Sequence, residues 1–270
     1  MSIAAPDADA LAAEFLAARE QARLLPLPQG LDLPTAYRVA ARIDAARIDA
    51  GEQPRGWKIG FTNRSIWPRY GVHQPIWARV WDTTLTLLEG AEADVSLAGL
   101  VQPRIEPEIV FGIARTPQAG MDETALLACL AWVAHGVEIV HTHFDGWKFQ
   151  AAADPVADFG LHGRLLVGPR RPVADWPALG ADLAAMTLAL KQGGVLRDQG
   201  QGALVLDGPL SALRHWLAAM AELTPGVQLQ PGDVVTTGTL TDAWPVAPGE
   251  TWSTHPGDVR LPSLCLRFTA

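Results

Sequence analysis

The pattern of apolar and polar positions changes once along the chain. Residues 8–24 and 34–50 carry Ala, Leu and Arg at helical spacing, and Pro34 fits the first turn of the second helix. After the turn-forming run "GEQPRG", short β-branched and apolar runs alternate with Gly and Pro turns, which is typical of a sheet-rich domain. The pattern therefore predicts an N-terminal helical region over residues 1–55 and a β-rich domain over residues 56–270.

Two further helices are expected inside the β-rich domain. One covers about residues 122–135, with Asp122 as the N-cap and Gly136 as the residue that ends it. The other covers about residues 209–223 and begins with a proline, which suits the first helical turn. Apolar residues recur at helical spacing on one face of this second segment, so we expect that face to be buried.

Turn signals in the second half of the chain predict strands. The run "TLALKQGGVLRDQ" reads as a hairpin that turns at Gly193 and Gly194. The runs "QPGDVVTTGTL", "APGETWST" and "LCLRFTA" read as late strands separated by Pro-Gly turns. Because the helices are too few and too irregular for alternating βαβ units, the α+β class is expected.

Composition and charge exclude several classes of protein. The 270 residues include 21 basic and 29 acidic ones, for a net charge of −8, and no Lys- or Arg-rich run is present, which argues against nucleic-acid binding. Cys129 and Cys265 are too few for a disulfide framework or a Cys-rich metal site. The N-terminus lacks a basic segment, and the longest apolar stretch, near 125–137, is too short to span a bilayer. We expect a cytoplasmic protein that binds neither nucleic acid nor membrane.

The run "VQPRIEPEIVF" places two acids inside an apolar strand. Side chains at i and i+2 share one face of a strand, so Glu106 and Glu108 point the same way. Pro107 donates no ladder hydrogen bond, which indicates an edge, a bulge or a rim. Unpaired carboxylates in a partly buried place cost several kcal/mol each, so arginines, protons or a divalent cation must neutralise them. The alternative is a solvated edge strand in which Arg104 pairs with one of the two acids.

A third acid favours a cation. The run "HGVEIVH" places Glu138 in an apolar strand directly after the helix predicted to end near residue 135. Three carboxylates that emerge from apolar strands suit a hard cation with oxygen ligands, Mg²⁺ or Mn²⁺. A rival interpretation is an iron site of two histidines and one carboxylate, in which His143 and Asp145 form an H-x-D pair and the distant His255 is the second histidine.

Five blocks of the chain resemble, in order, those of the fumarylacetoacetate hydrolase superfamily, and within it the 2-keto-4-pentenoate hydratase and 4-oxalocrotonate decarboxylase branch. The resemblance covers about residues 34–270. It is carried by "GWKIGFT" (56–62), "VQPRIEPEI" (101–109), "GVEIV" (136–140), "DPVADFG" (154–160) and "GDVVTTGTL" (232–240). It implies a mixed β-roll or sandwich with peripheral helices, a Mg²⁺ or Mn²⁺ site, a small 2-oxo or 2-hydroxydienoic acid substrate and a homo-oligomer.

The resemblance also implies roles for individual residues. Glu106, Glu108 and Glu138 would be the metal ligands. A 2-oxo acid would chelate the ion through its carboxylate and C2 oxygen, so that the ion acts as Lewis acid and template. The active-site lysine would bind the substrate carboxylate or shuttle a proton. The active-site lysine would be Lys58. The implied substrate-binding residues are Gln102, Asp158, Thr237 and Gly238.

The chain departs from the family pattern at several positions. Hydratases of the branch carry an acid where this chain has Ile76, whereas decarboxylases carry an apolar residue there. Lys148 and Phe149 also resemble the decarboxylases. The usual Asn-Ala-Ser stretch is replaced by "FGLHG", which introduces His162. We therefore hypothesise that His143 and His162 supply the acid–base group of the catalytic domain.

Four functions follow from these features. The first is a metal-dependent lyase that hydrates a short 2-hydroxydienoic or 2-oxoenoic acid. The second is a decarboxylase of the same substrate class, favoured by Ile76. The third is a hydrolase that cleaves a C–C bond in an acylpyruvate, with water activated by His135, His141 or His143. The last is an accessory subunit, against which the three acids argue, because a bystander has no need for buried charges.

Overall fold

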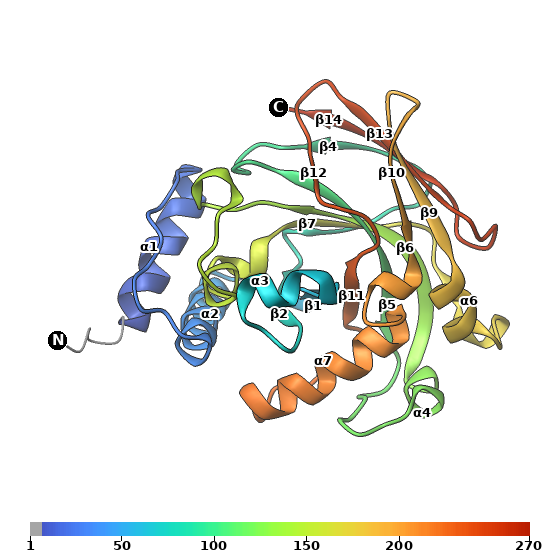
Figure 1. Ribbon diagram of the computed structural model, residues 1–270, viewed down its shortest axis with the longest axis horizontal. Coiled ribbons are helices and arrows are strands. Elements are labelled where there is room, and N and C mark those ends of the chain that lie inside the picture. Colours follow the sequence, from blue (N-terminus) through green and yellow to red (C-terminus); the bar gives the residue numbers. More distant parts are fainter. Residues whose placement is uncertain (1–6) are drawn as a thin grey trace.

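The computed structural model describes residues 7–270, and residues 1–6 of the predicted helical region lie outside the described residues. Two helices, α1 (Ala8–Gln21) and α2 (Leu33–Asp49), pack together at the N-terminal side of the molecule (Figure 1). Asp32 caps α2, because its side chain accepts a hydrogen bond from a first-turn amide. Both helices agree with the predicted segments to within three residues.

Five further helices follow in the β-rich part of the described chain. They are α3 (Trp67–Tyr70), α4 (Glu123–Leu127), α5 (Ala153–Ala157), α6 (Leu179–Ala185) and α7 (Pro209–Leu223). Short 3₁₀ turns cover Arg64–Ile66, Asp145–Trp147, Phe159–Leu161, Val173–Asp175 and Gly202–Leu204. Within residues 7–270, no helix combines the length and the apolar character needed to cross a bilayer.

Two sheets form the centre of the described chain. The larger has the order β2 (Ile76–Trp81), β1 (Pro54–Gly60), β11 (Val234–Thr239), β5 (Arg104–Ile113), β6 (Leu130–Val140), β7 (His162–Val167), β3 (Leu85–Leu87), with β12 (Trp244–Pro245) on β5 and β8 (Arg171–Pro172) on β6. The smaller has the order β10 (Val195–Gln201), β9 (Thr187–Gln192), β13 (Thr251–Pro256), β14 (Leu264–Thr269), β4 (Glu92–Ser96). Parallel and antiparallel pairs are mixed, as the family resemblance implies, and helices do not alternate regularly with strands, in agreement with the α+β prediction.

The large sheet curls, so it has an outer face and an inner face. Its outer face packs on the helices and on the smaller sheet, through two separate clusters of buried apolar side chains. A third, small cluster joins residues of five strands on the inner face of the curl: Val80, Val110, Ala134, Leu165, Val167 and Val234. Glu108 and Val110 share a face of β5, because they are two residues apart. The inner face of the roll therefore carries the acidic residues.

The helix predicted over residues 122–135 is wrong beyond its first turn. Asp122 does cap a helix, since its Oδ1 accepts from the Ala125 amide at 2.8 Å, but this helix ends at Leu127 and β6 follows. Gly136 lies in mid-strand, where a Cβ atom would meet a backbone oxygen of β7. A strand buried on both faces gives a near-continuous apolar run, and periodicity alone cannot distinguish such a run from a buried helix.

The other predicted elements are confirmed. Gly193 and Gly194 connect β9 to β10 with φ values of +56° and +84°, which a type I′ hairpin turn requires. The three late runs form β11, β13 and β14. Because β1 begins at Pro54, the sheet starts close to the expected boundary near residue 55, although the division into a helical region and a catalytic domain stays a prediction.

Candidate metal centre

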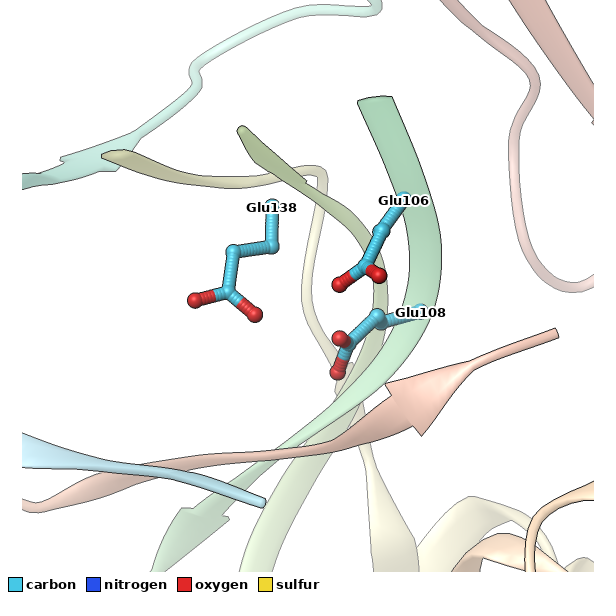
Figure 2. Close-up of side chains that lie close together, drawn as sticks. All are labelled: Glu106, Glu108 and Glu138. Atoms are coloured by element: carbon cyan, nitrogen blue, oxygen red, sulfur yellow. The ribbon is translucent and has the colours of Figure 1, made fainter. Parts of the chain in front are cut away.

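Three glutamates converge on the inner face of the curled sheet. Strand β5 presents Glu106 and Glu108 on one face, and the antiparallel register places Glu138 of β6 directly opposite Glu106. One carboxylate oxygen from each residue lies within 4.8 Å of the others, and Figure 2 shows the three side chains turned toward a common point. Among residues 7–270, this is the only group of three or more His, Cys, Asp or Glu side chains with such spacing.

Pro107 marks a bulge and not an edge. Strand β5 has partners on both sides, and Pro107 faces Val137 in the β6 ladder. On the β11 side, the register shifts between Thr236 and Thr239, so the missing proline N–H falls at an irregularity. The Pro107 carbonyl accepts from the Leu240 amide at 2.9 Å. Of the three alternatives, the structure shows the bulge, and the interpretation as a solvated edge strand is wrong.

Arg104 forms no ion pair with the acids of the described chain, although its charge opposes the rise in the pKa of Glu106. Its guanidinium stacks over the Trp147 ring at 4.3 Å, and its Nη1 donates to the Ala243 carbonyl at 3.3 Å. No ion pair joins it to a glutamate among the described residues. The charges of the cluster must therefore be balanced by other means.

Lys58 of β1 supplies part of that balance. Its side chain is buried, and its Nζ lies 3.3 Å from Glu138 Oε2. Burial alone would lower the pKa of Lys58, but the three surrounding carboxylates outweigh it and raise that pKa, so the lysine keeps its charge. Burial first, and then the neighbouring acids, raise the pKa of both Glu106 and Glu108 to about 8. One lysine does not offset three carboxylates.

One carboxylate oxygen is left without a partner in the described chain, and a second contacts only Lys58. Glu108 Oε2 accepts from the Gly238 amide at 2.8 Å, and Glu138 Oε1 lies 2.7 Å from His162 Nδ1. Glu108 Oε1 is buried and has no hydrogen-bond partner in the described chain, whereas the buried Glu138 Oε2 has only the ion pair with Lys58. Buried acceptors without donors are rare, and they are what a cation site requires. With Lys58, the ionised cluster carries a formal charge of −2, which matches a divalent ion.

A cavity of about 510 Å³ opens beside the cluster. Lys58, Glu106 and Gly238 form part of its wall. Its other walls mix apolar and polar side chains, with Asp242 among the polar ones, and include five aromatic residues and two arginines: Phe61, Arg69, Tyr70, Arg104, Trp147, Phe149 and Trp244. Such a cavity suits a small anionic ligand that binds at the acidic cluster through a cation and extends along an apolar and cationic surface.

Two of the predicted substrate-binding residues have other contacts. Gln102 donates through Nε2 to the Phe144 carbonyl at 2.9 Å and accepts from the Gly146 amide at 2.8 Å, so it ties down the loop after β6. Thr237 Oγ1 donates to the Ile109 carbonyl at 3.0 Å, across the ladder. Neither lines the described cavity, whereas Gly238 does.

Asp158 and His143 form a buried pair behind this loop. Asp158 Oδ1 lies 2.5 Å from His143 Nδ1, and Asp158 Oδ2 accepts from the His143 amide and from Thr142 Oγ1. Neither residue lines the described cavity. Asp145 is exposed and joins no metal-like cluster within residues 7–270, so the geometry does not support the iron-site interpretation.

The other histidines also lie outside the cavity wall. His135 contacts the Glu108 carbonyl and Thr254, on the far side of β5 and β6. His141 accepts from the Val101 amide, and His162 stands behind Glu138. Sequence reasoning placed acid–base chemistry on His143 and His162 because the chain departs from the family pattern at Ile76 and in the stretch that introduces His162. It did not indicate Arg69, which lines the cavity.

Comparisons with known proteins agree with this geometry. No protein-family model matches the chain. The 2-hydroxyhexa-2,4-dienoate hydratase of Comamonas testosteroni is 31% identical over 240 residues, which cover 87% of this chain and 88% of the relative. The 2-keto-4-pentenoate hydratase of Burkholderia vietnamiensis is 31% identical, covering 84% and 83%. A 4-oxalocrotonate decarboxylase of a Pseudomonas species is 29% identical, covering 76% and 75%.

Solved structures show the same fold. The 4-oxalocrotonate decarboxylase from Pseudomonas putida G7, complexed with magnesium and adipate, superposes with a TM-score of 0.87 at 24% identity and covers 97% of both chains. Fumarylpyruvate hydrolase from Pseudomonas aeruginosa, in complex with Mn²⁺ and pyruvate, gives a TM-score of 0.57 at 15% identity, covering 80% of this chain and 89% of that one. The chain belongs to the fumarylacetoacetate hydrolase superfamily, in its 2-keto-4-pentenoate hydratase and 4-oxalocrotonate decarboxylase branch.

Proposed function

We propose that this protein hydrates a short 2-hydroxydienoic acid to a 4-hydroxy-2-oxo acid in a metal-dependent reaction. The observation that carries the proposal is the convergence of three glutamates, among them Glu108 with a buried oxygen that has no partner in the described chain, beside a cavity lined by Glu106 and Lys58. The names of several relatives, which are hydratases of such acids, support the choice of reaction.

Glu106, Glu108 and Glu138 would hold the ion, and Mg²⁺ is the first choice, with Mn²⁺ the second. Carboxylate oxygens are the ligands both ions prefer. The magnesium complex of the Pseudomonas putida decarboxylase supports this assignment. When bound, the ion supplies Lewis-acid stabilisation of negative charge on the C2 oxygen of the substrate.

Lys58 binds the substrate carboxylate in this proposal. Its raised pKa keeps it cationic, and its buried position strengthens the attraction to an anion. Because His143 and His162 do not line the cavity, the acid–base role first expected of them is not part of the proposal. Tyr70 and Asp242, which do line it, are the side chains left to move a proton at the far end of the substrate.

Decarboxylation is the second candidate, and one observation favours it. Arg69 and Arg104 line the cavity together with Ile76, so a second carboxylate on the substrate would find cationic partners. That arrangement fits a dicarboxylic 2-oxo acid of the 4-oxalocrotonate type. Acylpyruvate hydrolysis is less well supported, since no histidine lines the described cavity.

Two assays test the proposal. Loss of dienol absorbance on incubation with 2-hydroxypenta-2,4-dienoate and Mg²⁺ is expected for the hydratase, and release of CO₂ from 4-oxalocrotonate would indicate the decarboxylase. The Glu108→Gln variant is the control, because it removes one ligand charge at nearly constant size. Wild-type protein that converts neither substrate with Mg²⁺ or Mn²⁺ would contradict the proposal. In a decarboxylase, Arg104→Ala should raise KM for the dicarboxylic substrate.

We also infer a homo-oligomer, as the family resemblance implies. Light scattering after size-exclusion chromatography would measure the mass directly. A particle at the mass of a single 28.9 kDa chain would contradict this inference.

A further inference from the structure

His162 is the buried link between a metal-ligand candidate and the turn that precedes β3. It is the first residue of β7 and only 1% exposed. Its Nδ1 lies 2.7 Å from Glu138 Oε1, and its Nε2 lies 2.8 Å from Thr84 Oγ1. Because an ionised carboxylate can only accept, Nδ1 carries the hydrogen, and Nε2 of the neutral ring accepts from the threonine hydroxyl.

This contact decides which oxygen of Glu138 faces the cluster. His162 engages Oε1 of Glu138 at 2.7 Å. The other oxygen, Oε2, is ion-paired with Lys58 Nζ at 3.3 Å. Without the ring, only this ion pair would hold the carboxylate, which could turn about its last torsion angle, a soft one.

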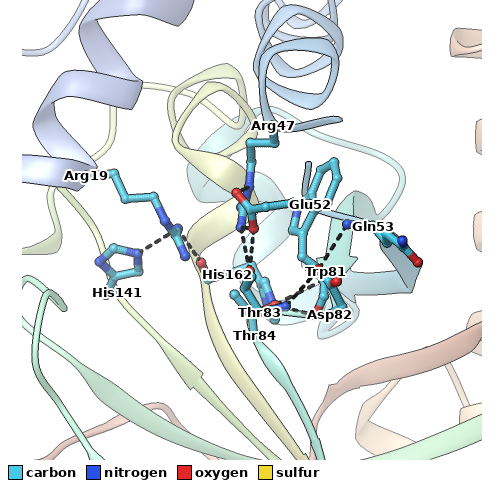
Figure 3. A network of polar contacts seen from close by, with 10 residues as sticks. All are labelled: Arg19, Arg47, Glu52, Gln53, Trp81, Asp82, Thr83, Thr84, His141 and His162. Atoms are coloured by element: carbon cyan, nitrogen blue, oxygen red, sulfur yellow. Dashed lines mark hydrogen bonds and ion pairs between the residues drawn. The ribbon is translucent and has the colours of Figure 1, made fainter. Parts of the chain in front are cut away.

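The turn that carries Thr84 is itself fixed. Thr84 Oγ1 accepts from the Trp81 amide at 3.1 Å, which closes the turn. The neighbouring Thr83 donates to Glu52, and Glu52 is held by Arg47 of α2 through two hydrogen bonds of 2.9 Å and 2.6 Å. Figure 3 shows both sets of contacts beside His162, joined through the adjacent residues Thr83 and Thr84 of the chain.

The backbone of His162 is held from the opposite side. Arg19 of α1 donates through Nη1 to the His162 carbonyl at 3.0 Å, and the same atom lies 3.3 Å from His141 Nε2 (Figure 3). Its guanidinium also stacks over the Phe159 ring at 4.7 Å. Both N-terminal helices therefore contribute to the position of the imidazole, although neither lines the cavity near the acids.

We propose that His162 is a positioning residue, oriented by Thr84, that fixes Glu138 with one oxygen turned toward the metal. It does not exchange protons with the substrate. The inference rests on the proposed metal site, but not on which reaction the site performs. Hydrogen bonds behind metal-binding carboxylates of this kind typically change metal affinity by about 10- to 100-fold when they are removed.

Two nearly isosteric variants test the donor. His162→Asn keeps an N–H close to the position of Nδ1, whereas His162→Leu has a similar shape and no donor. Titration calorimetry with Mg²⁺ and no substrate should show affinity reduced by about 10- to 100-fold in His162→Leu and largely restored in His162→Asn. Equal affinities in these two variants, or wild-type affinity in His162→Leu, would overturn the inference.

A second pair tests the orienting hydroxyl and covers the case in which His162→Leu fails to fold. Thr84→Val removes the hydroxyl, and Thr84→Ser keeps it, so Mg²⁺ affinity should fall in the first variant only. Affinities that are the same in both would also overturn the inference. Thermal unfolding in EDTA identifies the variants that are folded without metal.

Steady-state kinetics separate positioning from acid–base chemistry. At saturating Mg²⁺, a positioning role predicts that His162→Leu recovers most of kcat and keeps both limbs of the pH profile. Loss of one limb at saturating metal would instead identify His162 as an acid or base and overturn the inference. Wild-type protein that binds Mg²⁺ but fails the hydratase assay would contradict only the proposed reaction.

Discussion

Binding of Mg²⁺ should expel protons from the acidic cluster. The pKa values of Glu106 and Glu108 are raised to about 8, first by burial and then by the neighbouring carboxylates. Each group would then hold about 0.9 of a proton at pH 7 and about 0.1 at pH 9. A divalent ion binds the ionised carboxylates, so we expect close to two protons to be released at pH 7 and almost none at pH 9.

The same competition sets the pH dependence of the affinity. Protons and the ion compete for the same oxygens, so affinity rises with pH. Between pH 7 and pH 9, the ionised fraction of each of the two groups rises about 10-fold, which gives an increase in affinity on the order of 100-fold, or about 2.7 kcal/mol. Lys58 does not change this sign, because its pKa is raised and it remains charged over the interval.

Titration calorimetry at pH 7 in PIPES and in Tris measures the release. These buffers differ in ionisation enthalpy, so the difference between the two observed binding enthalpies gives the number of protons. The Glu108→Gln variant is the control and should release about one proton fewer. Binding enthalpies that do not depend on the buffer at pH 7, or an affinity that is constant from pH 7 to pH 9, would refute the reasoning.

Three further predictions concern stability and binding. Metal-free protein should lose stability as pH rises from about 4.5 toward 8, because the raised pKa values of Glu106 and Glu108 favour folding only while these groups are protonated. The free energy of unfolding should fall by at most about 1.4 kcal/mol per pH unit for each carboxyl. Urea unfolding in EDTA measures this loss, which should be smaller when Mg²⁺ is present. Lys58→Met should reduce kcat/KM by about 100-fold or more, mainly through KM if the lysine binds the carboxylate; an unchanged KM would contradict that role. Gly238→Ala should lower the free energy of unfolding by about 2–4 kcal/mol, because φ is +98° and the new Cβ would lie 1.9 Å from Thr62 Oγ1. Gly249→Ala is the control: its φ is +87° but its Cβ would meet open space, so the free energy of unfolding should fall by only about 1 kcal/mol.

The part of the acidic cluster that could be predicted from the sequence is the pair of glutamates on β5. The i, i+2 spacing places Glu106 and Glu108 on one face whatever the tertiary structure. Their position opposite Glu138 depends on the register of β5 and β6, which no local pattern reveals. The fold itself was predictable from the family resemblance and from the change near residue 55 from helical spacing of apolar residues to short β-branched runs.

The remaining differences have physical causes. The segment after Leu127 was predicted as helix because a fully buried strand lacks the alternation that identifies a half-buried one. The contacts of His162 with Thr84, and of Arg19 with the His162 carbonyl, join residues 78 and 143 positions apart. Nothing in the amphipathic pattern of α1 distinguishes Arg19 from an exposed arginine, so only tertiary structure could identify it.

The pairing of β5 with β6 has a consequence for refolding. Side chains alternate along a strand, so a slip of one residue would carry Glu138 to the outer face and leave Glu106 and Glu108 without their third partner. A chain trapped in that register could keep much of its strand content and yet chelate poorly. The fraction of refolded protein that takes up Mg²⁺ would then report native alignment, which circular dichroism cannot distinguish.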